Sequence, residues 1–308
     1  MKIIDFYGKR RIFYAISLTI FLIGLIMCFV DGVQLDIQFK GGSLLKYNYK
    51  GEINADKAAD ITSDIVNRVV STQVTTDLAT GEKRLVINIA GDYGLDVKDQ
   101  EKLDTALKKE FPDAQLTLSE STMVEPFFGR KFLTNGIKAI LLSAVLVVIY
   151  VWIRFRRIGG LSAGIMALVA LFHDLVVVFV TCVVFHIPIG DSFVAVTLTI
   201  IGYSINDTIV IYDRIRENAK KYPKESVETV TNLSITQSMT RSINTNLAVL
   251  ISVSMIYILA FANSIESVQS FALPMAIGSI SGCYSTICIA GPLWVAWKKH
   301  RETERKMH

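Results

Sequence analysis

The chain has 308 residues, of which 51% are hydrophobic and only 19% are charged, and its mean hydropathy is +0.43. A soluble protein of this length places most of its charge on the surface and does not average so apolar. The formal net charge of +4 is too small to indicate a nucleic-acid partner, and none is expected. The apolar residues are gathered into long uncharged runs, which is typical of helices that cross a membrane.

Six apolar runs reach the length of about 18–25 residues that crosses a hydrocarbon core of ~30 Å, the fifth with an extension at its start. They are Ile12–Val30, Gly136–Ile153, Leu161–Phe185, Phe193–Ile211, Leu247–Ala262 and Phe271–Trp297. The first run follows basic residues, as a signal peptide does, but it is longer than a typical signal-peptide core. No Ala-x-Ala cleavage pattern follows it, so we expect an uncleaved membrane anchor.

The short connections between the runs predict the orientation. Two of them, His186–Ser192 and Asn263–Ser270, contain no Lys or Arg. Basic residues instead gather in the N-terminus, in Arg154–Arg157, in Arg214–Arg241 and in the tail Lys298–Lys306. Because Lys and Arg favour the cytoplasmic side, both termini are expected in the cytoplasm.

Residues 31–133, between the first two runs, are soluble in character and are expected on the extracytoplasmic side. Their pattern predicts strand Ser43–Tyr49, helix Ala55–Val70, strands Thr72–Asp77 and Lys83–Ile89, helix Val97–Phe111 and strand Gln115–Ser121. This order is the ferredoxin-like α+β pattern. The predicted divisions are therefore 1–30 (N-terminus and first span), 31–133 (ferredoxin-like domain), 134–297 (spans two to six) and 298–308 (basic cytoplasmic tail).

Nothing in this domain indicates catalysis, since it contains no histidine or cysteine and its carboxylates lie at helix starts or on exposed faces. The four cysteines of the chain, Cys28, Cys182, Cys283 and Cys288, all lie within the apolar runs, so no disulfide framework or thiolate metal site is expected. We predict a compact interaction domain in a protein that is not an enzyme and has no cofactor.

The fourth run carries a carboxylate, Asp207, in a polar helical face formed with Thr199, Tyr203 and Asn206. An isolated ionised carboxylate in hydrocarbon costs about 3 kcal/mol on insertion scales. Asp207 should therefore face protein or water and be either paired or neutral. It can serve proton or ion movement, or it can be a hydrogen-bonding group that holds helices together.

Two further polar groups interrupt the apolar pattern. Arg241, on a polar face with Ser234, Ser238 and Thr245, is the expected partner of Asp207, although it can also be an arginine that reaches the membrane surface. His173 and Asp174 lie near the middle of the third run, where a structural and a functional role are both open. Glycines and serines recur in the last run, which favours close helix packing: Gly278, Ser281, Gly282 and Ser285.

Three motifs together resemble a known family: Gly202–Asn218, Thr240–Thr245 and the Phe-Lys-Gly-Gly of Phe39–Gly42. The chain is similar along nearly its whole length to the SecF subunits of the bacterial SecD–SecF protein-export complex, within the resistance-nodulation-division superfamily. One position departs from the family, which usually has an aspartate where this chain has Gln38. No charge-dependent role is expected there.

The resemblance implies a multi-pass protein of the bacterial cytoplasmic membrane that uses the proton or sodium motive force in late steps of preprotein export. It places Asp207 and Arg241 among the ion-coupling groups, to which we add neighbouring Asn206, with Asp174 and His173 as secondary candidates. The implied partners are SecD, the SecYEG channel with its ATPase motor, the translocating preprotein and membrane lipids.

Two other classes of protein are alternatives to a protein-export subunit. An ion-coupled small-molecule or lipid exporter of the same superfamily should have a second large outer loop or a twelve-span chain, and this sequence has neither. An intramembrane aspartyl protease would need Asp174 and Asp207 to face each other and share a proton. The Gly-x-Gly-Asp motif of such proteases is absent.

Overall fold

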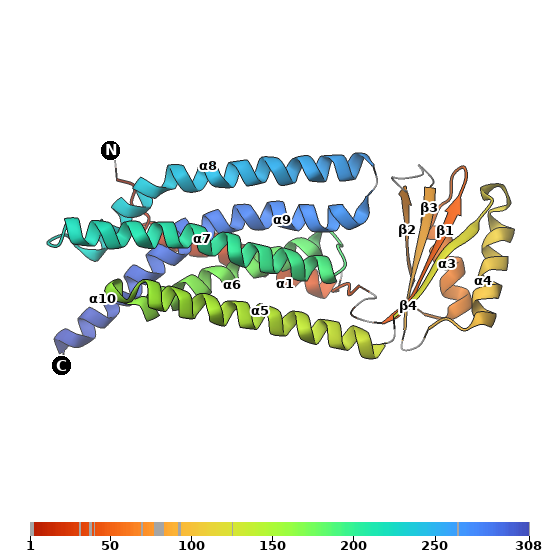
Figure 1. Cartoon of the computed structure of the whole chain (residues 1–308), viewed down its shortest axis with the longest axis horizontal. Helices are drawn as coiled ribbons and strands as arrows, with labels where there is room; N and C mark the ends of the chain where they lie inside the picture. Colours follow the sequence, from red (N-terminus) through yellow and green to blue (C-terminus); the bar gives the residue numbers. More distant parts are fainter. Residues whose placement is uncertain are drawn as a thin grey trace.

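A computed structural model describes residues 3–30, 32–36, 39, 41–68, 70–76, 83–91, 94–124, 126–263 and 265–307. Gln38 lies outside the described residues. The molecule consists of a bundle of long helices with a small sheet domain at one end (Figure 1). Both termini lie toward the end of the bundle that is remote from the sheet (Figure 1).

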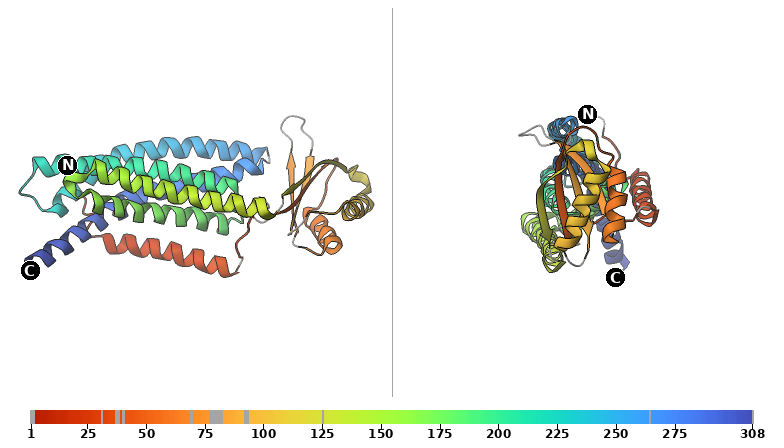
Figure 2. Two further views of the ribbon diagram at one scale, coloured as in Figure 1. Left: turned by 60° about the horizontal axis from the view of Figure 1, so that its bottom comes forward. Right: turned by 90° about the vertical axis from the view of Figure 1, so that its right-hand side faces the viewer.

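The bundle is built from α1 (Arg10–Val30), α5 (Pro126–Arg154), α6 (Gly160–Val184), α7 (Asp191–Lys221), α8 (Val227–Ala262), α9 (Glu266–Ser285) and α10 (Gly291–Met307). A short π-helical turn, Thr286–Ala290, joins α9 to α10. Within the described residues, six helices are long and apolar enough to cross a membrane, with α9 and α10 counted as one. Each contains one of the predicted runs, and α8 begins well before the apolar run at Leu247. The helix α1 lies along the edge of the bundle, against α6 (Figure 2).

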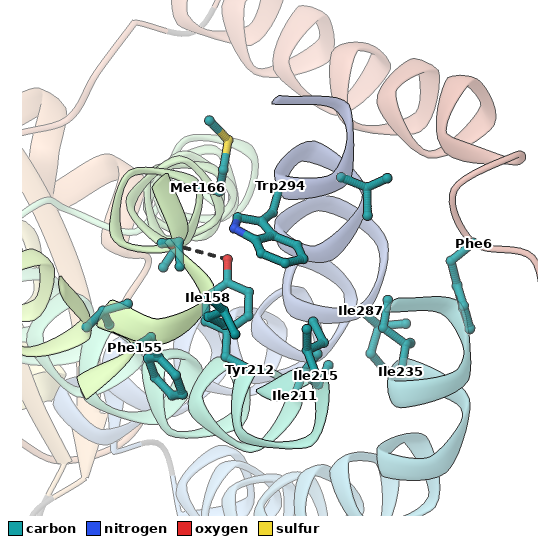
Figure 3. Close-up of a cluster of buried hydrophobic side chains, with 14 of the residues drawn as sticks. Phe6, Phe155, Ile158, Met166, Ile211, Tyr212, Ile215, Ile235, Ile287 and Trp294 are labelled. Carbon is teal, nitrogen blue, oxygen red and sulfur yellow. Dashed lines mark hydrogen bonds between the residues drawn. The ribbon is translucent and has the colours of Figure 1, made fainter. Parts of the chain in front are cut away.

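A cluster of buried hydrophobic side chains, which includes Phe155, Tyr212 and Trp294, packs between the helices of the bundle (Figure 3). The Tyr212 ring contacts Phe155 edge-on, with centroids 5.6 Å apart, and lies 6.3 Å from the Trp294 ring. The Tyr212 hydroxyl donates to the Ala163 carbonyl over 3.2 Å. Because these residues come from the residue after α5, from α6, from α7 and from α10, the cluster fixes the half of α7 that is remote from the sheet.

The sheet has four strands: β1 (Gly42–Tyr49), β2 (Val70–Thr76), β3 (Lys83–Ala90) and β4 (Thr117–Val124). Their order is β2-β3-β1-β4, and every neighbouring pair is antiparallel. Alternation along β1 and β3 turns one set of apolar side chains onto α3 (Ala55–Val66) and α4 (Val97–Glu110), where they form a buried core. The helices cover the far face of the sheet, and the other face is turned toward the bundle (Figure 1).

Two element boundaries differ from the prediction because single residues adopt the left-handed conformation. The helix α3 ends at Val66 rather than at residue 70, since Asn67 has φ 50° and its N–H donates to the Ser63 carbonyl. The last strand begins at Thr117 rather than Gln115, since Gln115 has φ 46°.

Two chain segments connect the sheet domain to the bundle. Before the sheet, Leu35 forms an isolated parallel bridge with Ile189, which lies in the connection between α6 and α7. The Ile189 N–H donates to the Gln34 carbonyl over 2.8 Å, and the Asp36 N–H donates to the Ile189 carbonyl over 3.1 Å. After the sheet, β4 ends at Val124 and α5 begins at Pro126. The start of α7, at Asp191, thus follows directly on the bridge.

Candidate functional site

Asp207 lies on the buried side of α7 and is 8% exposed. The Ser242 hydroxyl of α8 donates to its Oδ1 atom over 2.5 Å. Within the described part of the chain, the buried Oδ2 atom has no hydrogen-bond partner. Buried polar atoms are nearly always paired, so one unpaired oxygen on a carboxylate inside the bundle needs an explanation.

Arg241 does not form the expected ion pair with Asp207 in this structure. Its side chain is exposed, and among the described residues no carboxylate lies within ion-pair distance of it. Successive helical residues point about 100° apart, so when Ser242 faces α7 its neighbour Arg241 leaves α8 on a different side. The charge of Arg241 nevertheless lies near enough to act on the Asp207 carboxylate. Asn206 is exposed for the same reason, beside buried Asp207.

Arg241 and Asn206 belong to an exposed polar surface that extends across α7 and α8. We call it the α7–α8 polar face, and it consists of Thr199, Gly202 and Asn206 of α7 with Arg241, Asn244 and Thr245 of α8. A side chain built on Gly202 would meet nothing within 4 Å. The face therefore has room for a closely packed helix from another chain.

Asp174 is fully buried and has a complete set of hydrogen-bond donors. Its Oδ2 atom accepts from Ser204 of α7 over 2.7 Å and from Ser285 of α9 over 2.8 Å. Its Oδ1 atom accepts from Ser281 of α9 over 2.6 Å and lies 3.3 Å from His173 Nδ1. A carboxylate offers about four acceptor positions. Three serine hydroxyls occupy three of them here, and His173 Nδ1 lies against the fourth. We call Asp174 with these four side chains the Asp174 cluster.

The sequence did not predict the serines of this cluster. Ser281 and Ser285 were interpreted only as small residues for close packing, and Ser204 was not singled out. The available signal was the spacing of four residues between Ser281 and Ser285, which places two hydroxyls on one helix face. His173 itself lies between the rings of Phe21 and Tyr284, at centroid distances of 5.4 and 5.7 Å.

Asp174 and Asp207 share no hydrogen bond among the described residues, and the donors around Asp174 are serines and a histidine. A protease dyad needs two carboxyls that share a proton, so the geometry does not support that alternative. The link between the two aspartates runs through α7. Ser204 donates to Asp174, and its carbonyl accepts from Thr208 over 3.1 Å, one turn further along the helix.

Six long apolar helices, a sheet domain after the first of them and carboxylates buried between the others define a polytopic membrane protein. A family model described as "Protein export membrane protein SecD/SecF, C-terminal" matches residues 102–300. The Protein translocase subunit SecF of Petrotoga mobilis is 30% identical over 99% of this chain and 100% of its own length. That of Alicyclobacillus acidocaldarius is 33% identical over 96% of this chain and 92% of its own. The chain belongs to the SecF family of protein translocase subunits, and its role is in protein export.

Longer relatives contain this chain as a part. Protein translocase subunit SecDF of Bacillus subtilis is 31% identical over 96% of this chain, which spans 38% of that protein. The crystal structure of SecDF from Thermus thermophilus, a translocon-associated membrane protein, matches 97% of this chain with a TM-score of 0.79 and 24% identity, and the chain spans 39% of it. A SecDF structure in a super-membrane-facing form matches all of this chain with a TM-score of 0.71, and the chain spans 40% of it. These two structures share the fold.

Proposed function

We propose that the chain uses the proton or sodium motive force to promote late steps of preprotein export across the cytoplasmic membrane, and that Asp207 is its ion-coupling carboxylate. The observation that carries this proposal is the buried Oδ2 atom of Asp207, which has no hydrogen-bond partner within the described residues. Asp207 has one fixed contact, from Ser242, and one oxygen that can accept a proton or a cation. Asp174, in contrast, has no acceptor position left.

The energy available is sufficient to shift a two-state element. One charge that crosses the membrane field releases about 2.3 kcal/mol per 100 mV. When Asp207 changes between neutral and ionised, the best contact for its Oδ2 atom changes, and so does the preferred packing of α7 against α8. The outer end of α7 follows the Leu35–Ile189 bridge, so a shift of α7 reaches the segment that leads to the sheet.

We assign Asp174 a structural role within this mechanism. The Asp174 cluster ties α6 to α7 and α9 through three serine hydroxyls, with every carboxylate position occupied. A fully satisfied buried group holds helices in one arrangement, whereas a partly satisfied group can exchange ligands. The same helix α7 is thus fixed at Ser204 and adjustable three residues later at Asp207.

The proposed orientation places both termini in the cytoplasm and the sheet domain on the extracytoplasmic side. The distribution of Lys and Arg supports it. We assign the domain, residues 31–133, to the ferredoxin-like fold because its strands and helices alternate as β-α-β-β-α-β and its strand order is β2-β3-β1-β4. Spans two to six and the basic tail 298–308 complete the proposed division.

We propose SecD as the partner that covers the α7–α8 polar face. Uncovered amide and guanidinium groups at membrane depth are costly, so protein is expected against them. The chain spans about two fifths of the SecDF proteins that it matches, and the remaining part of those proteins is the natural source of a covering helix. The SecYEG channel, its ATPase motor, the preprotein and membrane lipids complete the proposed setting.

Gly202→Trp should prevent assembly with the partner. A Cβ at Gly202 meets nothing within 4 Å inside this chain, so the indole is expected to occupy the open space in front of the α7–α8 polar face. We expect the variant to insert normally and to lose co-purification with the partner subunit. Leu142→Trp is the matched control, because Leu142 is exposed on α5, away from this face. Normal co-purification of Gly202→Trp would place the partner elsewhere.

Arg241→Lys should lose gradient-dependent export although it keeps the positive charge. Arg241 faces the surface where the partner is proposed, and a guanidinium presents a planar set of donors that an ammonium cannot reproduce. The measurement is preprotein export into membrane vesicles with and without a gradient, and Arg156→Lys, in the exposed turn after α5, is the control. If Arg241→Lys exports at the normal rate, the result would favour the alternative in which Arg241 only extends its charge to the membrane surface.

The experiment that tests the proposed function as a whole is the same vesicle assay applied to Asp207. If a gradient speeds export only when this carboxylate is present, the ion-coupling role holds.

A further inference from the structure

A cavity of about 820 Å³ lies between the sheet and the adjacent end of the bundle. Its roof is the face of the sheet that α3 and α4 leave uncovered (Figure 1). Its floor is formed by the connection between α6 and α7 and by the ends of α8 and α9. The size falls in the range of ligand pockets, about 300–1,000 Å³. We call this cavity the sheet–bundle cleft.

The roof of the cleft is lined mostly by polar side chains in cross-strand register, with the apolar Leu44 and Val86 among them. Gln73, Val86, Lys46 and Glu120 lie opposite one another across the four strands. In the row beside it, Asn88 and Thr122 lie on either side of Leu44, so amides and hydroxyls are present on several strands of the face. This composition differs from that of a lipid or small-molecule site, which is predominantly apolar.

Two of the charges on the roof, those of Lys46 and Glu120, are paired with each other. Lys46 Nζ donates to Glu120 over 2.7 Å, and this hydrogen bond, with a second from Thr122, lowers the pKa of the Glu120 carboxyl. Arg84 Nε donates to the Asn48 amide oxygen over 3.0 Å. The Arg84 bond leaves the guanidinium charge in place, and Asp36 and Asp191 also line the cleft. An occupant therefore meets charges of both signs.

The floor of the cleft contains an unusual backbone conformation. His186, an exposed residue at the end of α6, has φ 54°, which is uncommon for a residue other than glycine. Such conformations gather at binding and switch regions, where the surrounding structure maintains them. Here the neighbouring Ile187 N–H donates to the Cys182 carbonyl over 2.8 Å, and Ile189 is held by the Leu35 bridge.

We propose that the sheet–bundle cleft receives an extended, unfolded segment of polypeptide and binds it mainly through its backbone. This inference rests on the proposed role in preprotein export and names a surface for that cargo. Cargo of many sequences has only its backbone in common, and that backbone carries one N–H donor and one carbonyl acceptor per residue. Amide side chains donate and accept at once, and so do hydroxyls, so the roof can pair with any backbone register. Because charges of both signs line the cleft, it does not select cargo side chains of one charge.

Disulfide cross-linking in the assembled translocase tests this proposal. Gln73→Cys places a thiol on the roof, and Thr105→Cys places one on the exposed side of α4, on the far face of the sheet. The probe is a secretory preprotein with a single cysteine, arrested partway through export, and the unmodified chain gives the background of its own four cysteines. We expect oxidation to join the preprotein to Gln73→Cys several times more often than to Thr105→Cys.

A second pair of variants tests whether filling the cleft impairs export. Asn88→Trp fills the cleft from the roof and should reduce the gradient-dependent part of export while co-purification with the partner stays normal. Thr105→Trp, the matched change on α4, should have no effect.

Equal cross-linking at both cysteines, or a product between Gln73→Cys and the partner subunit in place of the preprotein, would overturn the proposal. These outcomes are independent of ion coupling, because cross-linking to arrested cargo is scored without a gradient. The coupling role, in contrast, fails only if Asp207 variants keep the gradient response.

Discussion

Asp207→Asn should abolish the response of preprotein export to a proton or sodium gradient while the protein stays inserted, assembled and at normal abundance. Asparagine keeps the size of the side chain, and its amide can still accept from Ser242. A hydrogen-bonding group that only holds helices together would therefore survive the change. A carboxylate that alternates between neutral and ionised would not, because the amide does not titrate.

The measurement is export into vesicles with and without an imposed gradient, scored separately for the early ATP-driven part and the late part. Asp213→Asn is the control on the same helix, since Asp213 pairs with Arg154 over 2.9 Å and with Arg216 over 2.8 Å near the end of α7. It should keep the gradient response. If Asp207→Asn responds as the wild type does, Asp207 is structural and the proposed coupling fails.

Asp174→Leu should reduce both the abundance of the protein and its thermal stability. The leucine removes the acceptor of three serine hydroxyls and of His173 in a fully buried site. Each buried donor left without a partner costs about 1–3 kcal/mol, although a serine that turns back to its own helix recovers part of this. The total is several kcal/mol, which is a large part of the stability of a typical domain, about 5–15 kcal/mol.

The check is the amount of protein in the membrane and the midpoint of thermal unfolding of the detergent-solubilised complex. Asp207→Asn serves as the comparison, because it should leave both quantities unchanged. A normal midpoint for Asp174→Leu together with a lost gradient response would contradict the structural role and would place Asp174 in the ion pathway.

The sequence predicted the spans and the elements of the sheet domain because their signals are local. An apolar run or an alternating pattern lies within a few turns of chain, and each predicted run falls on one of the six long helices, the last of which is α9 and α10 taken together. The start of α8 was less predictable, since its first turns are polar. There Ser234 bonds to the Val230 carbonyl of its own helix and accepts from Asn218 of α7, contacts that hydropathy does not record.

The contacts of the candidate site could be predicted only in part. Asp207 stands out because a carboxylate is rare in an apolar run, but its partner depends on how α8 is rotated about its axis. Charge alone favours Arg241, whereas the packing of α8 turns Ser242 inward. The Asp174 cluster depends on Ser281 and Ser285, more than a hundred residues further along the chain, and no local pattern brings these residues together.

The two connections of the sheet domain define how it can move. One is the segment held at Leu35 by Ile189, and the other is the passage from β4 into α5. A rigid body attached at two points turns most easily about the line that joins them. Since one attachment lies next to the first residue of α7, we expect a small displacement of that helix end to produce a larger displacement at the far edge of the sheet, at β2. Gln73, which lies on β2, should therefore move with that far edge when the domain turns.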